Sequence, residues 1–311
     1  MTTKNKKKLF WIFILIIIIL SIIIFIFFNK KSISTPSDST PFRDNAGRLV
    51  VTASLFPEYD FAKEVGGDKA VVSLILPPGI EPHSFKPSDK ELNIIKNSAI
   101  FFYTSSLMES WAPVLKNQVS SKTKVVAAAD NLADNNLDPH VWLDFSKAQQ
   151  MVDSIKTSYQ IVDPANYNYY QTNADNYKKK LAVLDAEYFT GLKDCRFKGF
   201  ISGGHNTFSY LAKRYGLDYK AAQGFIPDSS VDTEKILALS QELKNKKEPY
   251  VYYEELIMPY LAEILHQESG ARIMPLNAAH NVARYDIENG VNFIQLMEAD
   301  LKTLRLGLDC R

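Results

Sequence analysis

Short apolar runs alternate with amphipathic stretches along most of the chain. Runs such as 48–56 (RLVVTASLF), 70–77 (AVVSLILP) and 99–105 (AIFFYTS) are typical of strands buried in a sheet. The stretch 144–162 instead repeats its apolar residues at helical spacing, and the same alternation returns between 197 and 307. Strands that alternate with helices predict parallel sheets with helices on their faces. We found no internal sequence repeat.

A stretch of about thirty residues, 164–193, interrupts this alternation. It has no Gly or Pro between Pro164 and Gly191, and its apolar residues recur at helical spacing. We predict one long helix, which at the usual rise per residue measures roughly 40–45 Å. The predicted fold class is therefore α/β. Two lobes, 48–163 and 194–311, each hold a mostly parallel sheet flanked by helices, and the long backbone helix joins them.

An apolar segment near the N-terminus, residues 9–28, is long enough to cross a bilayer. Its twenty residues span roughly 30 Å as a helix. A cleavable signal has a shorter apolar core of about 7–15 residues and a small-residue cleavage site, which this chain lacks. No cysteine that could carry a lipid follows it closely. We expect residues 1–28 to hold an uncleaved membrane anchor, with a long signal peptide as the alternative. Residues 29–47, rich in Ser, Thr and Pro, are expected to form a flexible tether.

Charge is unevenly distributed along the chain. Four Lys precede the apolar segment and two follow it closely, so the positive-inside rule leaves the N-terminus in the cytoplasm and the body of the protein outside the cell. The whole chain carries a net charge of +1, but residues 1–47 carry +5 and the remainder −4. A mildly acidic body argues against a nucleic-acid partner and is compatible with a bound cation.

The chain has two cysteines, Cys195 and Cys310, and both lie in the part expected outside the cell. An even pair in an oxidising compartment predicts a disulfide, and the spacing does not match a metal site. The disulfide would close a loop of more than 100 residues and would stabilise the folded protein by roughly 4–5 kcal/mol in the chain-entropy model.

Four of the five histidines lie where a ligand-binding cleft is expected. His83, His205 and His280 follow predicted strands, and His140 precedes a predicted helix in the motif DPHVWLD. In open α/β sheets ligands bind beyond the carboxyl ends of the strands. Imidazoles at several such positions favour zinc or a related metal, whereas His266 lies inside a predicted helix and is expected to be structural. The chain lacks both the phosphate-loop motif G-x-x-x-x-G-K and the nucleophile motif G-x-S-x-G.

Nearly all of residues 48–311 resembles the metal-binding receptors of bacterial ABC importers for zinc and manganese, the cluster with two α/β lobes on a rigid helix. The segments that carry the resemblance are PPGIEPHSFKPSDKEL (77–92), DPHVWLD (138–144), GGHNTFSYLAKRYGL (203–217), GFIPDSSVDTEKI (224–236) and VYYEELIMPYLAEILHQESGARIMPLN (251–277). The resemblance implies that His83, His140 and His205 are metal ligands and that the metal lies between the lobes. Asp138 and Asp144 are candidates to orient the ring of His140, with helix capping as their alternative role.

At the fourth ligand the chain departs from the family's pattern. Where the family often has an acidic ligand, this chain reads LNAAHN, and His280 is the residue we expect to replace the acid. Asn277, Glu254, Glu255 or a water molecule are the alternatives. Zinc-specific members often carry a His-rich acidic loop, which this chain lacks, but three or four imidazoles still favour zinc over manganese.

The resemblance implies a membrane-anchored, solute-binding receptor that captures zinc outside the cell. It would pass the ion to an ABC permease, act as a monomer and not be an enzyme. A zinc-dependent hydrolase is one alternative, because three histidines and a water molecule also form a catalytic arrangement. A surface adhesin that contains the metal is another.

Overall fold

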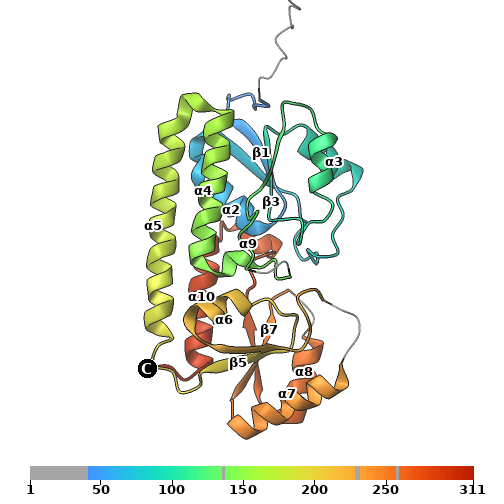
Figure 1. Ribbon diagram of the computed structural model, residues 1–311, viewed down its shortest axis with the longest axis vertical. Coiled ribbons are helices and arrows are strands. Elements are labelled where there is room, and N and C mark those ends of the chain that lie inside the picture. Colours follow the sequence, from blue (N-terminus) through green and yellow to red (C-terminus); the bar gives the residue numbers. More distant parts are fainter. Residues whose placement is uncertain (1–40, 135–136, 228–231, 257–258) are drawn as a thin grey trace, which may run out of the picture. The chain divides into compact units, whose positions relative to one another are not determined.

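Two four-stranded parallel sheets form the centres of two lobes in the computed structural model, which describes residues 41–134, 137–227, 232–256 and 259–311 (Figure 1). The strands are β1 (Leu49–Ala53), β2 (Ala70–Leu74), β3 (Ile100–Tyr103), β4 (Lys124–Ala127), β5 (Gly199–Ser202), β6 (Asp218–Ala221), β7 (Tyr250–Glu254) and β8 (Arg272–Leu276). The order is β2-β1-β3-β4 in one sheet and β6-β5-β7-β8 in the other, so the two lobes share one topology without a repeat in sequence. The predicted fold class is confirmed.

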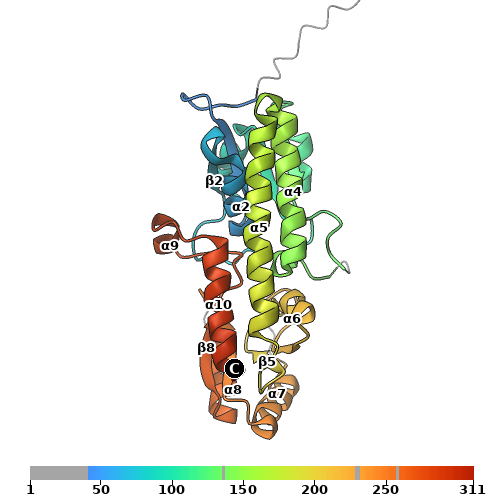
Figure 2. The same cartoon turned by 90° about the vertical axis from the view of Figure 1, so that its left-hand side faces the viewer.

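Helices cover the sheets and run alongside both lobes (Figures 1 and 2). They are α2 (Phe56–Gly66), α3 (Asp89–Lys96), α4 (Phe145–Val162), α5 (Tyr167–Gly191), α6 (Ser209–Tyr215), α7 (Thr233–Lys246), α8 (Tyr260–Ser269), α9 (Arg284–Glu288) and α10 (Phe293–Gly307). The predicted long helix is α5, with 25 residues. A short 3-10 turn, Pro164–Asn166, precedes it, with the proline in the first turn, where its missing N–H has no partner to lose.

The inner face of α5 is lined by tyrosines that fix it to both lobes. The hydroxyl of Tyr177 donates to Asp60 Oδ2 in α2 over 2.7 Å, and that of Tyr188 donates to the carbonyl of Met297 in α10 over 2.6 Å. Both rings are buried in one apolar cluster that contains residues of the two lobes. Each of these two buried hydroxyls therefore has a partner, and α5 contacts α2 of one lobe and α10 of the other.

Three details differ from the elements that the sequence predicted. Strand β6 was not predicted, because its DYKA sequence is short, half charged and exposed at the edge of the sheet. The sequence predicts one closing helix over 287–307, but Gly290, whose φ of 71° is left-handed, interrupts it. Helix α10 begins after the capping box of Asn292 and Gln295. The sequence predicts a helix over 229–247 with Ser229 or Ser230 as its cap, and both residues lie outside the described ranges. Helix α7 begins at Thr233 and is capped by Asp232.

The predicted disulfide between Cys195 and Cys310 is confirmed, with 115 residues separating the two. It joins the segment after α5 to the chain beyond α10, and the two residues also form an isolated antiparallel bridge. The last residues of the chain are thereby held against the start of the second lobe.

No helix within the described ranges is long and apolar enough to span a membrane. The anchor predicted at 9–28 lies outside those ranges.

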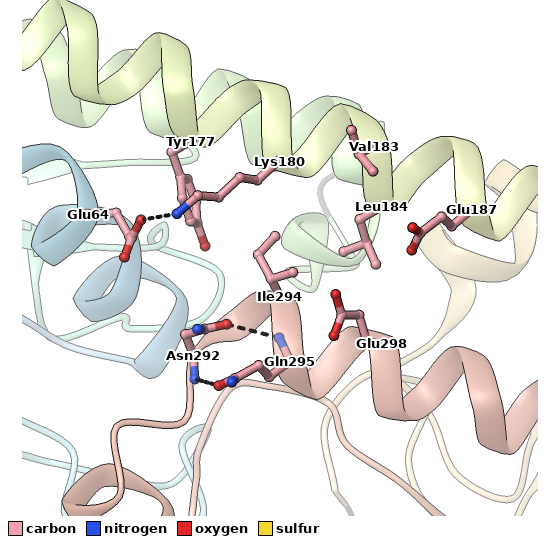
Figure 3. Close-up of a pocket in the computed structure, with 10 residues that line it drawn as sticks. All are labelled: Glu64, Tyr177, Lys180, Val183, Leu184, Glu187, Asn292, Ile294, Gln295 and Glu298. Carbon is pink, nitrogen blue, oxygen red and sulfur yellow. Dashed lines mark hydrogen bonds and ion pairs between the residues drawn. The ribbon is translucent and has the colours of Figure 1, made fainter.

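A groove of about 340 Å³ lies between α2, α5 and α10 (Figure 3). Lys180 on α5 forms an ion pair with Glu64 on α2 at one end, and Glu187 and Glu298 line its walls further along. None of the predicted metal ligands lines this groove, so it is separate from the site described next.

Candidate metal centre

The shared topology brings the histidine-bearing loops of both lobes to one place. His83 lies in the loop after β2, and His140 caps a 3-10 turn, Val141–Leu143, that leads into α4. His205 follows β5 and His280 follows β8, so three of the four lie beyond the carboxyl ends of strands. These are the positions at which open parallel sheets bind ligands.

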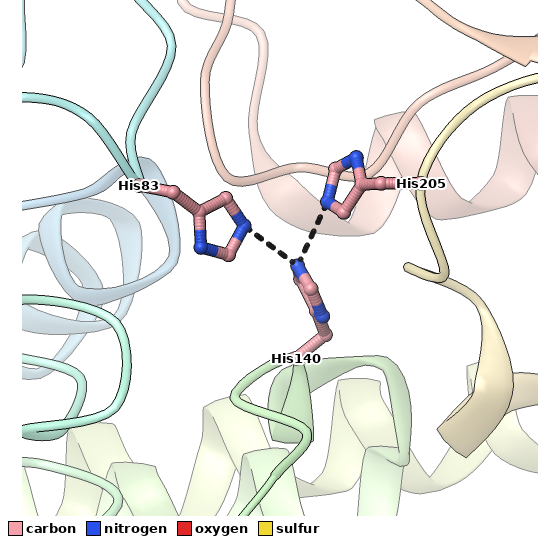
Figure 4. Close-up of side chains that lie close together, drawn as sticks. All are labelled: His83, His140 and His205. Carbon is pink, nitrogen blue, oxygen red and sulfur yellow. Dashed lines mark hydrogen bonds between the residues drawn. The ribbon is translucent and has the colours of Figure 1, made fainter. Parts of the chain in front are cut away.

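Three ring nitrogens converge at the centre of the site (Figure 4). Nε2 of His140 lies 3.3 Å from Nε2 of His83 and 3.2 Å from Nε2 of His205. A tetrahedral zinc ion with nitrogen ligands at about 2.0–2.1 Å has ligand–ligand separations of roughly 3.3–3.4 Å. The observed spacing of the three nitrogens therefore matches three corners of a zinc tetrahedron.

Carboxylates behind two of the rings set which nitrogen faces the centre. Asp138 Oδ1 lies 2.9 Å from His140 Nδ1, and Glu254 Oε1 lies 2.7 Å from His205 Nδ1. Opposite an ionised carboxylate, Nδ1 carries the ring proton and Nε2 keeps its lone pair. The hydroxyl of Thr207, 2.9 Å from His205 Nε2, can donate to one of these lone pairs. The Nε2 lone pairs of His140 and His205 both lie at the centre, 3.2 Å apart, an arrangement that a cation stabilises.

Burial keeps two of the rings in their metal-binding form. Burial lowers the pKa of His83 to about 3, and the nearby charges of His205 and His280 act in the same direction. Burial also holds the pKa of His140 well below its ordinary value. Both imidazoles are therefore neutral near pH 7, as a metal ligand must be.

The two carboxylates differ in their electrostatic setting. Burial raises the pKa of Asp138 to about 7, although the backbone N–H of His140 stabilises its charged form. Burial also acts to raise the pKa of Glu254, but the contacts with His205 and His280 outweigh it and lower the pKa to about 2. Glu254 is therefore a fixed negative charge beside the rings, and a +2 ion at Nε2 would favour the charged form of Asp138 as well.

His280 lies at the edge of the three-histidine cluster. Its ring centroid is 6.2 Å from that of His140 and 6.0 Å from that of His205, whereas the centroids within the cluster are 5.1–5.2 Å apart. Its Nε2 lies 3.5 Å from Glu254 Oε2, and these two residues form a second group of potential donors with His205. The ring is buried, and neither nitrogen makes a hydrogen bond with a described residue.

Other candidates from the sequence have structural partners instead. Asn277 uses its amide to bind Ala279 N and Glu255, so it is turned away from a ligand role. Asp144 caps α4 by accepting from Ser146 N. It also pairs with Arg214 at 2.9 Å, so the capping alternative holds for it.

His266 lies in α8 with its Nδ1 2.8 Å from the carbonyl of Ala271. It belongs to neither group of potential donors found among the described residues, in agreement with the structural role expected from the sequence. This leaves it as a natural control for experiments on the other histidines.

Most of the chain is similar in sequence to known zinc-uptake and zinc-binding proteins. Residues 51–307 match the family model of the zinc-uptake complex component A, periplasmic. The chain is 31% identical over 283 residues to the zinc-binding lipoprotein AdcA of Streptococcus pneumoniae, which covers 85% of this chain and 56% of that protein. It is 30% identical over 281 residues to the high-affinity zinc uptake system protein ZnuA of Bacillus subtilis, covering 84% of this chain and 88% of that protein.

Solved structures of zinc-binding and metal-transporting proteins are also similar to this chain. The Zn(II)-bound ZnuA-like domain of Streptococcus pneumoniae AdcA has a TM-score of 0.74 and 34% identity, and the match covers 85% of this chain and all of that one. The laminin-binding protein Lmb of Streptococcus agalactiae, described as having adhesin and metal-transporting activity, has a TM-score of 0.75 and 28% identity over 84% of this chain and 99% of its own. The chain thus spans about half the length of the curated AdcA relatives but nearly the whole of their ZnuA-like domain.

Proposed function

Because the chain belongs to the family of zinc-uptake complex component A proteins, we propose that it is a receptor that captures zinc outside the cell and delivers it to an ABC permease. The observation that carries the proposal is the convergence of three Nε2 atoms at the spacing of a zinc tetrahedron. Zinc is favoured over manganese because the converging donors are imidazole nitrogens, whereas manganese prefers oxygen ligands.

The proposed ligands are Nε2 of His83, His140 and His205, with His280 as the fourth. A modest movement of the His280 ring would bring it to the distance at which the other three lie. Asp138 and Glu254 orient two of the rings and supply negative charge for the +2 ion.

Receptor function fits this site better than hydrolysis. A hydrolytic zinc site needs an open coordination position with a general base beside it. The two buried carboxylates closest to the rings contact Nδ1 atoms, on the side of the imidazoles away from the centre. Four protein ligands would close the coordination shell, as in a site that carries an ion instead of activating water.

The arrangement along the chain that we propose places the receptor at the cell membrane. Residues 1–28 anchor it and residues 29–47 tether the lobes at 48–163 and 194–311, which the helix region 164–193 connects. A monomer held in this way lies near its permease, and a flexible tether of 19 residues reaches on the order of 25 Å. Tethering raises the effective concentration for docking.

Metal analysis of the full-length protein in detergent tests the proposal. One zinc ion per chain is expected, and His83→Ala, His140→Ala and His205→Ala should each weaken binding by about tenfold or more, which is about 1.4 kcal/mol. His266→Ala is the matched control and should bind zinc as the unaltered protein does. Unchanged zinc affinity in the first three variants would refute the site.

A second pair of variants tests the fourth ligand. His280→Ala should lower zinc affinity by about tenfold or more, whereas Asn277→Ala should have little effect because its amide binds backbone and Glu255. A crystal structure with zinc in which the His280 ring points to solvent would remove this assignment.

A further inference from the structure

A cavity of about 230 Å³ lies where loops of the two lobes meet beside His280. Ile80 and Glu81 line it from the N-terminal lobe, and Glu255 and Leu256 line it from the C-terminal lobe. Ile80 and Leu256 are 45% and 42% exposed, whereas His280 is only 4% exposed. The cavity therefore connects solvent to a buried ring.

The backbone around this cavity adopts an uncommon conformation at two positions. Leu256 has a φ of 70° and Ala279 a φ of 55°, although neither is a glycine. Side chains rarely adopt this left-handed region, and such positions cluster at binding sites, where the surrounding structure holds them. They adjoin Glu255 and His280, the two C-terminal-lobe residues that could contact a cation here.

Each lobe contributes one carboxylate to the cavity. Glu81 accepts hydrogen bonds from the backbone N–H groups of His83 and Ser84, and Glu255 accepts one from Asn277. No described residue forms an ion pair with either acid, so their charges are not neutralised by a neighbour. Two such charges at an opening attract cations and raise the rate of their arrival.

The inner end of the cavity offers the first nitrogen donor. His280 has no hydrogen-bond partner for either ring nitrogen among the described residues, and it shares a donor group with His205 and Glu254. His205 also belongs to the group that contains His83 and His140. A cation bound by His280 and His205 would therefore already contact one residue of the central group, His205.

We propose that this cavity is the route by which the divalent cation enters and leaves the site, with Glu81 and Glu255 attracting the ion and His280 receiving it first. The proposal rests on the proposed function as a zinc receptor. It assigns to Glu81 and Glu255 a role in the rate of exchange that differs from the role of a ligand.

Asn281 sets the width of this route. Its Nδ2 donates to the carbonyl of Ile80 over 2.7 Å and lies 3.4 Å from that of Pro77, so it connects the loop after β8 to the loop that carries His83. The side chain is 6% exposed and closes one side of the cavity. Asn281→Ala removes this connection and should let the two loops separate more often.

Rates of zinc exchange distinguish a route from a ligand. Obstruction of a route slows association and dissociation by the same factor and leaves the dissociation constant unchanged, whereas loss of a ligand raises the dissociation constant. Ile80→Trp places a larger side chain at the opening while it keeps the backbone carbonyl that Asn281 binds. Ile226→Trp, at another exposed isoleucine that does not line the cavity, is its matched control.

The experiment uses the full-length protein and stopped-flow mixing with a fluorescent zinc chelator. Ile80→Trp should slow both rates by roughly threefold or more, and Asn281→Ala should accelerate both. Glu255→Gln should slow association at low salt by roughly threefold and reduce its dependence on ionic strength. Glu268→Gln, an exposed acid on α8, is the control for the loss of one charge.

The Ile80→Trp and Glu255→Gln comparisons decide the proposal. Rates in Ile80→Trp equal to those in Ile226→Trp would overturn it, as would a Glu255→Gln variant that exchanges zinc like Glu268→Gln. If Ile80→Trp no longer binds zinc, the Glu255→Gln pair decides alone. Failure of the unaltered protein to bind zinc would instead refute the proposed function, so the two failures are distinguishable.

Discussion

Asp138 offers a test of how the site is held together, because one oxygen makes both of its contacts with His140. Oδ1 accepts from His140 N at 3.0 Å and lies 2.9 Å from His140 Nδ1. Asp138→Asn can retain both contacts with His140 through its amide oxygen while it loses the negative charge. Asp138→Ala loses the contacts and the charge together, so the two variants separate orientation from electrostatics.

The expected losses follow from these distances. The 2.9 Å contact, the width of the imidazole ring and a zinc–nitrogen bond of about 2.0 Å place the carboxylate roughly 6 Å from the ion. One unit charge at roughly 6 Å from a +2 ion contributes about 1.4 kcal/mol even at the dielectric constant of water, or about tenfold in affinity. Removal of a partner that orients a ligand costs about 10–100-fold in total. We therefore expect about tenfold for Asp138→Asn and up to about 100-fold for Asp138→Ala.

Competitive titration of zinc against a chelator of known affinity measures both losses. Asp134→Asn removes a charge from the same segment at a residue that pairs with Lys147 and Lys213 and contacts no ligand ring, so it is the control. Zinc affinities in Asp138→Asn and Asp138→Ala that equal that of Asp134→Asn would refute the reasoning. Equal losses in the two Asp138 variants would assign the whole effect to charge.

Three further predictions concern stability and location. Replacing Cys195 and Cys310 by Ser frees a loop of 115 residues and should lower the free energy of unfolding by about 5 kcal/mol in the chain-entropy model, with zinc affinity unchanged; equal unfolding curves for both forms would contradict this. Burial, and then the charge of Glu109, raises the pKa of buried Glu58 well above 4.5, and burial raises that of Glu109 to about 7. Both carboxyls lose their protons at lower pH in the unfolded chain than in the folded protein, so the free energy of unfolding should fall as pH rises from 4.5 to about 7. Glu58→Gln should reduce this fall. In denaturant titrations at neutral pH, the variant should be more stable than the unaltered protein by roughly 1–3 kcal/mol. Full-length protein should stay in the membrane fraction with residues 9–28 intact, and a mature N-terminus beyond them in mass spectrometry would disprove the anchor.

The sequence predicted the architecture because the architecture depends on local patterns. Apolar runs and amphipathic periods repeat along the chain, and they specify strands and helices largely independently of distant contacts. The same reasoning missed β6, whose DYKA sequence has no apolar run and takes its place in the sheet by pairing with β5. A short edge strand has little apolar surface to bury, so its sequence resembles that of a loop.

The histidines were identifiable for a related reason. Positions just beyond predicted strands are brought to the same edge of a sheet, and four histidines occupied such positions or the start of a helix. The residues that contact the histidines from behind, and the other long-range contacts of the site, could not be predicted in the same way. Glu254 ends β7 and meets His205 after β5, a pairing that depends on the order of the strands in the sheet. Likewise, Trp142 Nε1 donates to the carbonyl of Ala278 across 136 residues, which no local pattern indicates.

Charge explains why this arrangement suits a +2 ion in particular. The four imidazoles proposed as ligands are neutral, and a divalent ion buried among them without counter-charge would be unstable. Glu254, with a pKa lowered to about 2, and Asp138 each lie directly behind a ring, so together they can balance the ion without occupying its coordination shell. Nε2 of His140 and Nε2 of His205, the two rings with a carboxylate at Nδ1, lie 3.2 Å apart. In the proposed site the two carboxylates therefore supply counter-charge for the ion, and the coordination positions are left to the imidazoles.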